Sequence, residues 1–333
     1  MNQLEAPVRV SVVIPVFNRR DMVAEAVDSA LAQTSAALEL EVIVVDDRST
    51  DDTVATLIVR YGHDVRVRIM GNTRAKGPAG ARNTGILAAR FPFVAFLDSD
   101  DFYLPGHLAA AVAVFARYPH VGLVFGRMRC EQNGIDVPHL VPKFEENIRR
   151  APRTQEDEST IVFGPDFFAH LLEAGCYFGL CSVLMRAEAA RELMSETLSS
   201  TEDYEFWART ARKRVFACLK APQVCVRRHA SNLSSDSAGQ VELNHLRACR
   251  MMLAYPGLRA NERRLIGARM AKASFDLAWR YKQNGCPIKS IGMNLQSMRY
   301  GLIWKNVLAL AKLPVSLFLR RRESMRHGQN FSA

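Results

Sequence analysis

The stretch from Val94 to Asp101 constrains the fold more than any other part of this 333-residue chain. Four consecutive apolar residues, Val94 to Leu97, predict a short strand buried on both faces, as in a parallel sheet. Three carboxylates follow at once, at Asp98, Asp100 and Asp101. Open α/β sheets bind ligands at the carboxyl ends of their strands, and two carboxylates in D-x-D spacing can share Mg²⁺ or Mn²⁺. From these residues alone, a polar turn that caps the next helix is an alternative.

Strands and helices alternate through the N-terminal third of the chain. Apolar, β-branched runs predict strands, and apolar residues at helical spacing predict the helices between them. The predicted strands are residues 10–16, 42–45, 65–70 and 94–97, and the predicted helices are residues 22–33, 53–60 and 77–90. This alternation is typical of an α/β fold with a doubly wound, mostly parallel sheet. Asp46 and Asp47 end the second strand, so we expect them at the same edge as Asp98 and Asp100.

The pattern is less regular beyond the fourth strand. Residues 131–160 are polar and contain three prolines, which predicts a long, mobile loop over the active site. Glu202 and Asp203 open an acidic helix, and His229 follows a strand and two arginines. Helix capping alone explains the two acids, and a lone histidine is usually an ordinary core or surface residue. The other elements predicted here are helices at 108–117 and 165–173, and strands at 121–127, 176–185 (lining a pocket) and 224–226.

Two common nucleotide-binding motifs are missing. The turn after the first strand, residues 15–18, has no glycine, so the glycine fingerprint of a dinucleotide-binding domain is absent from its required place. No phosphate-binding P-loop sequence occurs either. Residues 77–83 do offer backbone N–H groups at a helix start, with Lys76 and Arg82 nearby, and this combination suits a phosphate. The alternative is that these glycines only let the helix approach the sheet.

Composition and cysteine usage indicate a folded cytoplasmic protein. Hydrophobic residues make up 48 % of the chain, and seven scattered cysteines form no C-x-x-C pair. Reduced core thiols are therefore expected, rather than disulfides or a zinc site. Residues 1–9 lack the charged and apolar regions of a signal peptide, which agrees with this expectation.

Positive charge is concentrated at the C-terminal end. Residues 227–333 carry 19 Lys and Arg against 5 Asp and Glu, a balance of +14 within a total of +10. Such a region could face nucleic acid, anionic lipid or a phosphorylated substrate, but the lack of aromatic residues among its arginines speaks against nucleic acid. Residues 302–319 predict an amphipathic helix lying in a membrane interface, followed by Arg320–Arg322. The protein would then be peripheral at the inner face of the membrane. Packing of this helix on the protein's own core is the alternative.

Taken together, five segments resemble the family-2 glycosyltransferases, which are nucleotide-sugar enzymes of the GT-A fold. The segments occur in the family's order, cover residues 10–230, and are residues 12–18, 44–51, 80–85, 96–101 and 202–203. The resemblance implies a catalytic domain over residues 1–230 and leaves residues 231–333 as a helical, basic region. It also implies an inverting transfer from a nucleotide-diphosphate sugar, UDP-linked, to a hydroxyl of a glycan or lipid-linked acceptor in cell-envelope or exopolysaccharide synthesis.

The resemblance also implies a role for each matching residue. Asp203 would be the general base, with Glu202 beside it positioning substrate. Asp100, Asp98 and His229 would hold Mg²⁺ or Mn²⁺, although the match around His229 is loose. The nucleotide sugar would be bound by the residues at the strand ends and the glycine-rich turn, namely Pro15, Phe17, Asn18, Asp46, Asp47, Lys76, Arg82, Asp98 and Ser99. Among these, Asp47 would accept a hydrogen bond from the base and Arg82 would lie by the ribose or diphosphate.

A rival interpretation is a catalytically degenerate protein that binds a nucleotide sugar or docks a partner. Loss of either metal carboxylate or of the base would favour this rival. Asp98, Asp100 and Asp203 are all present. The sequence does not define the donor sugar, the acceptor or the linkage.

Overall fold

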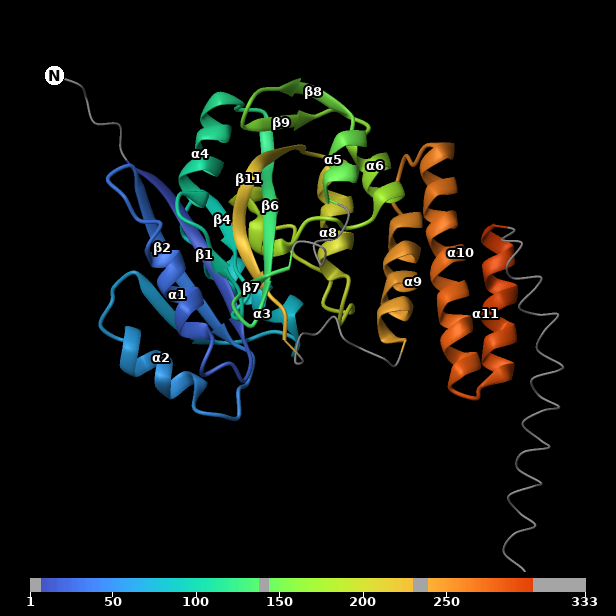
Figure 1. Cartoon of the computed structure of the whole chain (residues 1–333), viewed down its shortest axis with the longest axis horizontal. Helices are drawn as coiled ribbons and strands as arrows, with labels where there is room; N and C mark the ends of the chain where they lie inside the picture. Colours follow the sequence, from blue (N-terminus) through green and yellow to red (C-terminus); the bar gives the residue numbers. More distant parts are fainter. Residues whose placement is uncertain (1–6, 138–143, 230–238, 302–333) are drawn as a thin grey trace, which may run out of the picture. The chain divides into compact units, whose positions relative to one another are not determined.

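The computed structural model describes residues 7–137, 144–229 and 239–301. The chain forms two compact units, Met1–Asn232 and Leu233–Ala333, and each is described by itself. Figure 1 shows the elements of both. The predicted helix at residues 302–319 and the arginines that follow it lie outside the described residues.

Four parallel strands form the first half of the sheet in the first unit. They are β1 (Val8–Val16), β2 (Leu38–Asp46), β3 (Val67–Gly71) and β4 (Phe93–Phe96), in the spatial order β3-β2-β1-β4. The helices between them are α1 (Val23–Leu31), α2 (Thr53–Tyr61) and α3 (Pro78–Ala88). Each lies within a few residues of its predicted position, because runs of β-branched residues and Pro or Gly at their ends mark these elements clearly in the sequence.

The second half of the sheet is mixed. The short strand β10 (Leu184–Arg186) runs antiparallel between β4 and β6 (Val121–Gln132), and β11 (Val215–Arg227) runs parallel to β6. The remaining strands are β5 (Phe102–Tyr103), β7 (Ile135–Asp136), β8 (Arg153–Glu156) and β9 (Thr160–Phe163), and the helices are α4 (His107–Arg117), α6 (Phe167–Ala174), α7 (Ala187–Ala190) and α8 (Glu202–Ala211). The prediction of a doubly wound, mostly parallel sheet is confirmed.

Two predictions in this half are wrong. The described part of residues 131–160 is not one loop, because it contains β7, α5 (Phe144–Arg150) and β8. Helix α5 forms because Phe144 and Ile148, four residues apart, are both buried against the core. The predicted strand at residues 176–185 is mostly a loop and a 3₁₀ turn (Leu180–Ser182) before β10. There the Ser182 hydroxyl donates to the Gly179 carbonyl, a local bond that competes with strand pairing.

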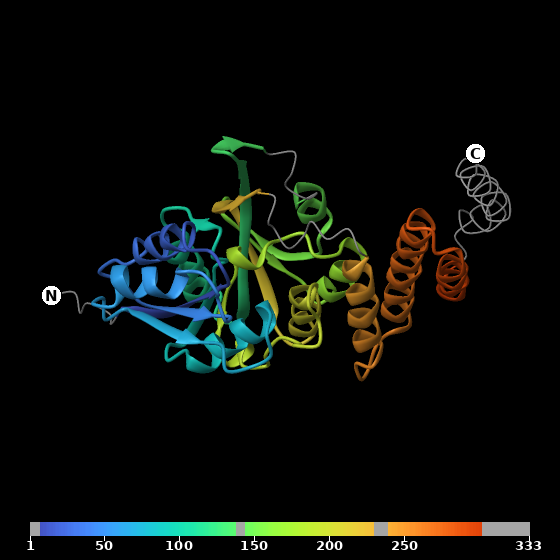
Figure 2. The same ribbon diagram turned by 90° about the horizontal axis from the view of Figure 1, so that it is seen from below.

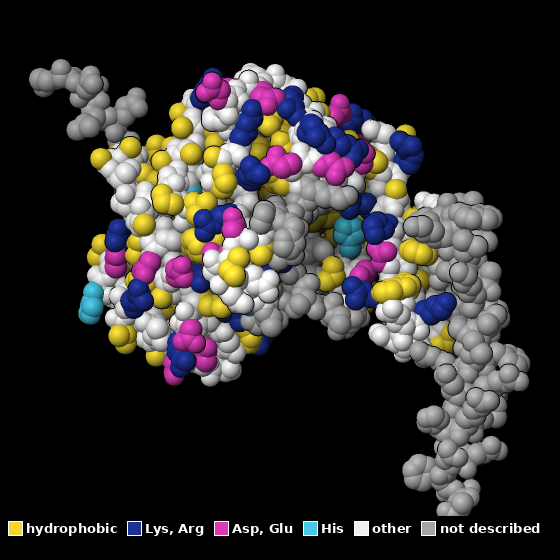
Figure 3. All heavy atoms as spheres, in the orientation of Figure 1, with side chains coloured by type: hydrophobic (Ala, Val, Ile, Leu, Met, Phe, Trp, Pro, Cys, Tyr) yellow, Lys and Arg dark blue, Asp and Glu magenta, His cyan; other side chains and the backbone are white. Residues whose placement is uncertain are grey.

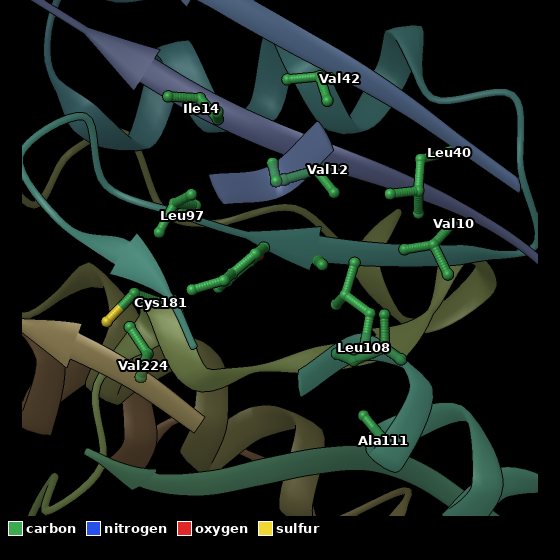
Figure 4. Packing of buried hydrophobic residues seen from close by; sticks show 14 of the residues in the cluster. Val10, Val12, Ile14, Leu40, Val42, Leu97, Leu108, Ala111, Cys181 and Val224 are labelled. Carbon is green, nitrogen blue, oxygen red and sulfur yellow. The ribbon is translucent and has the colours of Figure 1, made fainter. Parts of the chain in front are cut away.

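Apolar side chains cover both faces of the sheet. On one face, residues such as Val12, Ile14 and Val42 pack with Leu108 of α4 (Figure 4). A second cluster on the opposite face includes Trp207 of α8 with aromatic residues of β4, β6 and β9. A strand buried on both faces reads as a continuous apolar run, which is why the sequence predicts it so well. Charged side chains of both signs lie over the outer surface of this unit (Figure 3).

The second unit is helical. Its described helices are α9 (Gln240–Leu253), α10 (Ala260–Gln283) and α11 (Pro287–Tyr300). Helix α10 packs against both α9 and α11, and α10 and α11 lie side by side in both ribbon views (Figure 2). Within the described ranges, no helix combines the length and the apolar character that crossing a bilayer requires.

Candidate active site

The acids predicted at the strand ends do meet at one edge of the sheet. Strand β1 pairs with β2 and β4 in parallel, with Val16 opposite Asp46 and Val13 opposite Phe96. The residues that follow β2 and β4 therefore leave the sheet at the same edge, on either side of β1. This parallel register brings Asp47 to the same edge as the loop that holds Asp98 and Asp100.

Polar groups surround Asp47 at the end of β2. Its carboxylate is buried and accepts hydrogen bonds from Asn72 Nδ2 (2.6 Å) and from the Gly77 N–H (2.8 Å) at the start of α3. The Lys76 ammonium lies 4.6 Å from the centre of the Phe17 ring, which is exposed. An exposed aromatic ring beside a buried carboxylate can stack on a planar base and accept its N–H groups.

Two residues predicted to bind the nucleotide sugar, Asp46 and Asn18, accept hydrogen bonds from backbone groups of the neighbouring loop. Asp46 accepts hydrogen bonds from the backbone N–H groups of Arg48 and Ser49. Asn18 accepts one from the Thr50 N–H. Asn18 and Arg48 both adopt positive φ, of 50° and 68°, so these bonds stabilise tight turns that shape the edge. Pro15 lies within β1 opposite Val45, and Ser99 is buried in the turn after β4.

Arg82 joins the two acidic motifs. Its Nη2 donates to Asp98 Oδ1 (2.7 Å) and its Nη1 donates to Glu202 Oε1 (2.8 Å). The side chain is buried, on a helix whose residues from Ala79 to Ile86 are all buried. The Arg82 guanidinium is therefore enclosed between these two carboxylates, and its place by the ribose or diphosphate stays a prediction. It links the loop after β4 to the first turn of α8.

Asp100 and His229 come together from distant parts of the chain. His229 Nε2 lies 3.0 Å from Asp100 Oδ2, and Arg19 Nε lies 3.8 Å from the same oxygen. The antiparallel pairing of β5 with the end of β11 brings these segments into contact. Asp101, which is buried, reinforces the contact by accepting a hydrogen bond from the Arg227 N–H. Burial and the nearby Asp98 and Asp100 charges raise the pKa of Asp101 well above its usual value.

The Asp100–His229 pair fits part of a cation site. A carboxylate oxygen and an imidazole nitrogen are donors that divalent metals accept, and Mg²⁺ characteristically adds water and phosphate oxygens to one or two protein carboxylates. One oxygen of Asp98 is already bonded to Arg82. No group of three or more His, Cys, Asp and Glu residues could hold a metal by itself in the described part of the chain. The donor set therefore fits a cation that a bound diphosphate helps to hold.

Asp203 lies on the first turn of α8 in a different environment. Burial and the adjacent Glu202 charge raise its pKa to about 6, although the Tyr204 N–H and Arg82 oppose this shift. Its Oδ1 accepts a hydrogen bond from the Tyr204 N–H (2.6 Å), and its Oδ2 lies 3.9 Å from Cys176 Sγ. A carboxylate with a pKa near neutrality is suited to general acid–base catalysis.

Two neighbours of the site are absent from the predictions made from the sequence. Asn72 follows β3 and bonds to Asp47, and the rule that polar residues at strand ends form the site could have identified it. Arg19 approaches Asp100 from the loop after β1. No local signal marks it, because its position depends on the fold of that loop.

Comparison with known proteins agrees with this architecture. The sequence model described as Glycosyl transferase family 2 matches residues 11–173, the span that contains β1 to β4 and the acidic edge. Residues 11–173 therefore form a domain of glycosyltransferase family 2. The match ends before α8, so the sequence–family comparison does not include Glu202, Asp203 or His229.

Individual members and structures resemble the chain over different lengths. The succinoglycan biosynthesis protein ExoU of Rhizobium meliloti is 40 % identical over 31 % of this chain and 29 % of its own length. The Escherichia coli glucosyltransferase WfgD, named for UDP-Glc and α-D-GlcNAc-diphosphoundecaprenol, is 34 % identical over 40 % of this chain and 50 % of its own. The chain thus spans about half or less of these curated relatives.

The likeness to a solved structure covers nearly the whole chain. Staphylococcus aureus TarS 1–349, solved in complex with UDP-GlcNAc, superposes with a TM-score of 0.65 over 96 % of this chain and 92 % of TarS, at 20 % identity. At this identity the likeness concerns the fold alone. The expectation of a GT-A fold for this family-2 chain is confirmed, with a helical C-terminal region.

Proposed function

We propose that this family-2 chain is an inverting glycosyltransferase that moves a sugar from a UDP-linked donor to a hydroxyl of a glycan or lipid-linked acceptor in envelope or exopolysaccharide synthesis. The observation that carries the proposal is the link that Arg82 makes between Asp98 and Glu202. It joins the candidate donor and metal loop to the helix that carries Asp203. The catalytic region would be residues 1–230 and the basic helical region residues 231–333.

The donor would bind along the edge formed by β1, β2 and β4. The base would stack near Phe17 and meet Asp47, whose carboxylate is held in place by Asn72 and Gly77. The Lys76 ammonium beside the Phe17 ring adds positive charge for the diphosphate. Because no P-loop is present, the phosphates would depend on a cation and on these few side chains.

Asp100 and His229 would hold Mg²⁺ or Mn²⁺, with Asp98 adjacent. When bound, such an ion supplies positive charge that stabilises the leaving diphosphate. The ion pair of Asp98 with Arg82 fixes the orientation of the loop. The name of WfgD, which includes UDP-Glc, and the complex of TarS with UDP-GlcNAc support the choice of donor class.

Asp203 would act as the general base. It would take the proton of the acceptor hydroxyl while the acceptor oxygen forms a bond to the anomeric carbon and the bond from that carbon to the diphosphate oxygen breaks. A single displacement from the opposite face inverts the configuration. Glu202 is fixed by Arg82 and would position the sugar and the acceptor. A well-placed base contributes about 10²–10⁴-fold to such a rate.

The test is a screen of nucleotide sugars with purified full-length protein and Mn²⁺ or Mg²⁺, in which release of UDP and glycosylated product are both measured by mass spectrometry. Acceptors would include diphosphate-linked lipid sugars and free oligosaccharides. The proposal predicts product with at least one UDP-sugar and none with Asp203→Asn. Donor binding without any transfer across the panel would instead support a degenerate binding protein.

A further inference from the structure

Helix α11 has its polar side turned inward. Ser290, Asn294 and Ser297 are at most 2 % exposed, at spacings of four and three residues. The Ser297 hydroxyl donates to the Ala271 carbonyl of α10 (2.6 Å), and Asn294 Nδ2 donates to the Ser290 carbonyl (2.9 Å). The stripe that α11 packs inside its unit is therefore made of small polar residues, two of which donate side-chain hydrogen bonds to backbone carbonyls.

The opposite side of α11 is apolar and exposed. Ile288 is 84 % exposed and Leu295 is 56 % exposed, and seven residues separate them, so they share one face of the helix. A helix of a water-soluble domain normally has the reverse pattern, with apolar residues inward. Single exposed apolar residues are common. A buried polar stripe on one side of α11, with Ile288 and Leu295 exposed on the other, favours an outer face that meets an apolar surface.

The positive charge in and around α11 indicates what kind of apolar surface its outer face meets. From residue 277 to residue 322 the sequence contains nine Lys and Arg and no Asp or Glu. Lys289 is adjacent to Ile288, and Arg299 lies one turn after Leu295 on the same face, so cationic side chains border the exposed apolar ones. Apolar residues flanked by Lys and Arg are the composition of helices that lie in the interface of an anionic bilayer.

We propose that the outer face of α11 binds an anionic membrane, with Ile288 and Leu295 inserted among the lipids and Lys289 and Arg299 at the headgroups. The inference deepens the proposed function by naming where an enzyme with a lipid-linked acceptor would meet the membrane, and it rests on that part of the proposed function. It assigns the contact to a described helix rather than to residues 302–322. A second copy of the chain or the C-terminal segment could instead cover this face, and the test below separates these outcomes.

The test is binding of the full-length protein to vesicles of equal parts phosphatidylcholine and phosphatidylglycerol, measured by flotation. Replacing two inserted residues by acids, Ile288→Glu with Leu295→Glu, should weaken binding by at least about tenfold, because each change removes apolar contact and adds repulsion. The matched control is Val59→Glu with Val65→Glu, since these residues are 82 % and 92 % exposed on the other unit. The control should float like the unmodified protein.

A second variant tests the charge. Lys289→Gln with Arg299→Gln should weaken binding to the anionic vesicles by about tenfold or more, because each basic residue near such a surface contributes about fivefold. It should leave the weak binding to pure phosphatidylcholine unchanged. Vesicle binding needs no donor, acceptor or turnover, so its failure is distinguishable from failure of the transferase proposal.

Three results would overturn the inference. One is unchanged flotation of the Ile288→Glu, Leu295→Glu protein. Another is a dimer, seen by light scattering, that this variant converts to monomer, which would assign the face to a second copy. The third is a large drop in the melting temperature of the variant without lipid, which would show that another segment of the chain covers the face.

Discussion

The carboxylates of the candidate site fall into two kinds. Asp98 is held by the buried Arg82, and Asp100 lies against His229 and Arg19. Asp203 makes no ion pair within 4 Å among the residues that the structure describes, and burial beside Glu202 raises its pKa to about 6. The difference is instructive because cationic partners hold a carboxylate in a fixed position for ligand binding, whereas burial beside another acid raises the pKa of a carboxylate and prepares it to exchange a proton.

The largest expected effect comes from Asp203→Asn. This change keeps the shape of the side chain but removes the base, so transfer should fall by about 10²–10⁴-fold, or roughly 3–5 kcal/mol. Affinity for the UDP-sugar, measured by isothermal titration, should stay within a factor of about two. The control Asp21→Asn, at an exposed position, should change neither quantity. Transfer at the unmodified rate would show that Asp203 is only a helix-start acid.

Removing Arg82, which links Asp98 to the helix that carries Asp203, should lower the stability of the fold. Arg82→Met leaves Asp98 and Glu202 without their shared cation, and breaking a buried pair in this way costs about 3–5 kcal/mol. Urea unfolding monitored by tryptophan fluorescence would measure the loss. Arg20→Met, in which an exposed arginine is replaced, should leave the unfolding midpoint nearly unchanged. Equal stabilities for the two variants would contradict a structural role for Arg82.

The ionised carboxylate of Asp203 should also lower the free energy of unfolding at neutral pH. Its pKa is raised in the folded state, so the fold loses stability as pH rises from the usual pKa of an aspartate, about 4, to about 6. Asp203→Asn removes that loss and should be roughly 2–3 kcal/mol more stable than the unmodified protein above pH 6, with little difference below about pH 4. Thermal or urea unfolding at several pH values would test this. A variant that is less stable at pH 7 would mean that the carboxylate is well paired after all.

The paired acids should control donor binding rather than chemistry. Asp100→Ala should weaken UDP-sugar affinity at least about tenfold, or 1.4 kcal/mol. Removal of the metal by EDTA should weaken the affinity of the unmodified protein for the UDP-sugar to the same extent. EDTA should have no further effect on the variant. Asp52→Ala, at an exposed position, is the matched control. Affinity that is the same with and without metal would remove Asp100 and His229 from the metal site.

The parts of the fold that follow from short-range pattern are predictable. Strands β1 to β4 contain apolar runs, β2 and β4 are followed by acids, and one register rule places Asp47, Asp98 and Asp100 at a common edge. Strand β10, with three residues, carries too little pattern to reveal its antiparallel direction. Helix α5 is short and flanked by prolines, so its two buried residues do not distinguish it from a loop.

Other features of the site depend on contacts between distant segments. The approach of His229 to Asp100 requires the pairing of β5 with β11, more than a hundred residues apart in the sequence. Arg82 could be assigned to the diphosphate because its helix begins with glycines, but every residue from Ala79 to Ile86 is buried. Only the packed structure shows that its guanidinium faces two carboxylates. The reversed polarity of α11 is also not evident from the sequence, because the residues that it buries are serines and an asparagine.

The pH dependence of transfer tests the contrast between the two kinds of carboxylate most directly. Initial rates at saturating metal should be measured as kcat/KM across the acid range, together with UDP-sugar affinity at each pH. The account predicts a limb with an apparent pKa of about 6, below which the rate falls about tenfold per pH unit, while donor affinity changes little over the same range. A rate that is flat through pH 6, or one that follows donor affinity, would contradict the assignment of Asp203 as the base.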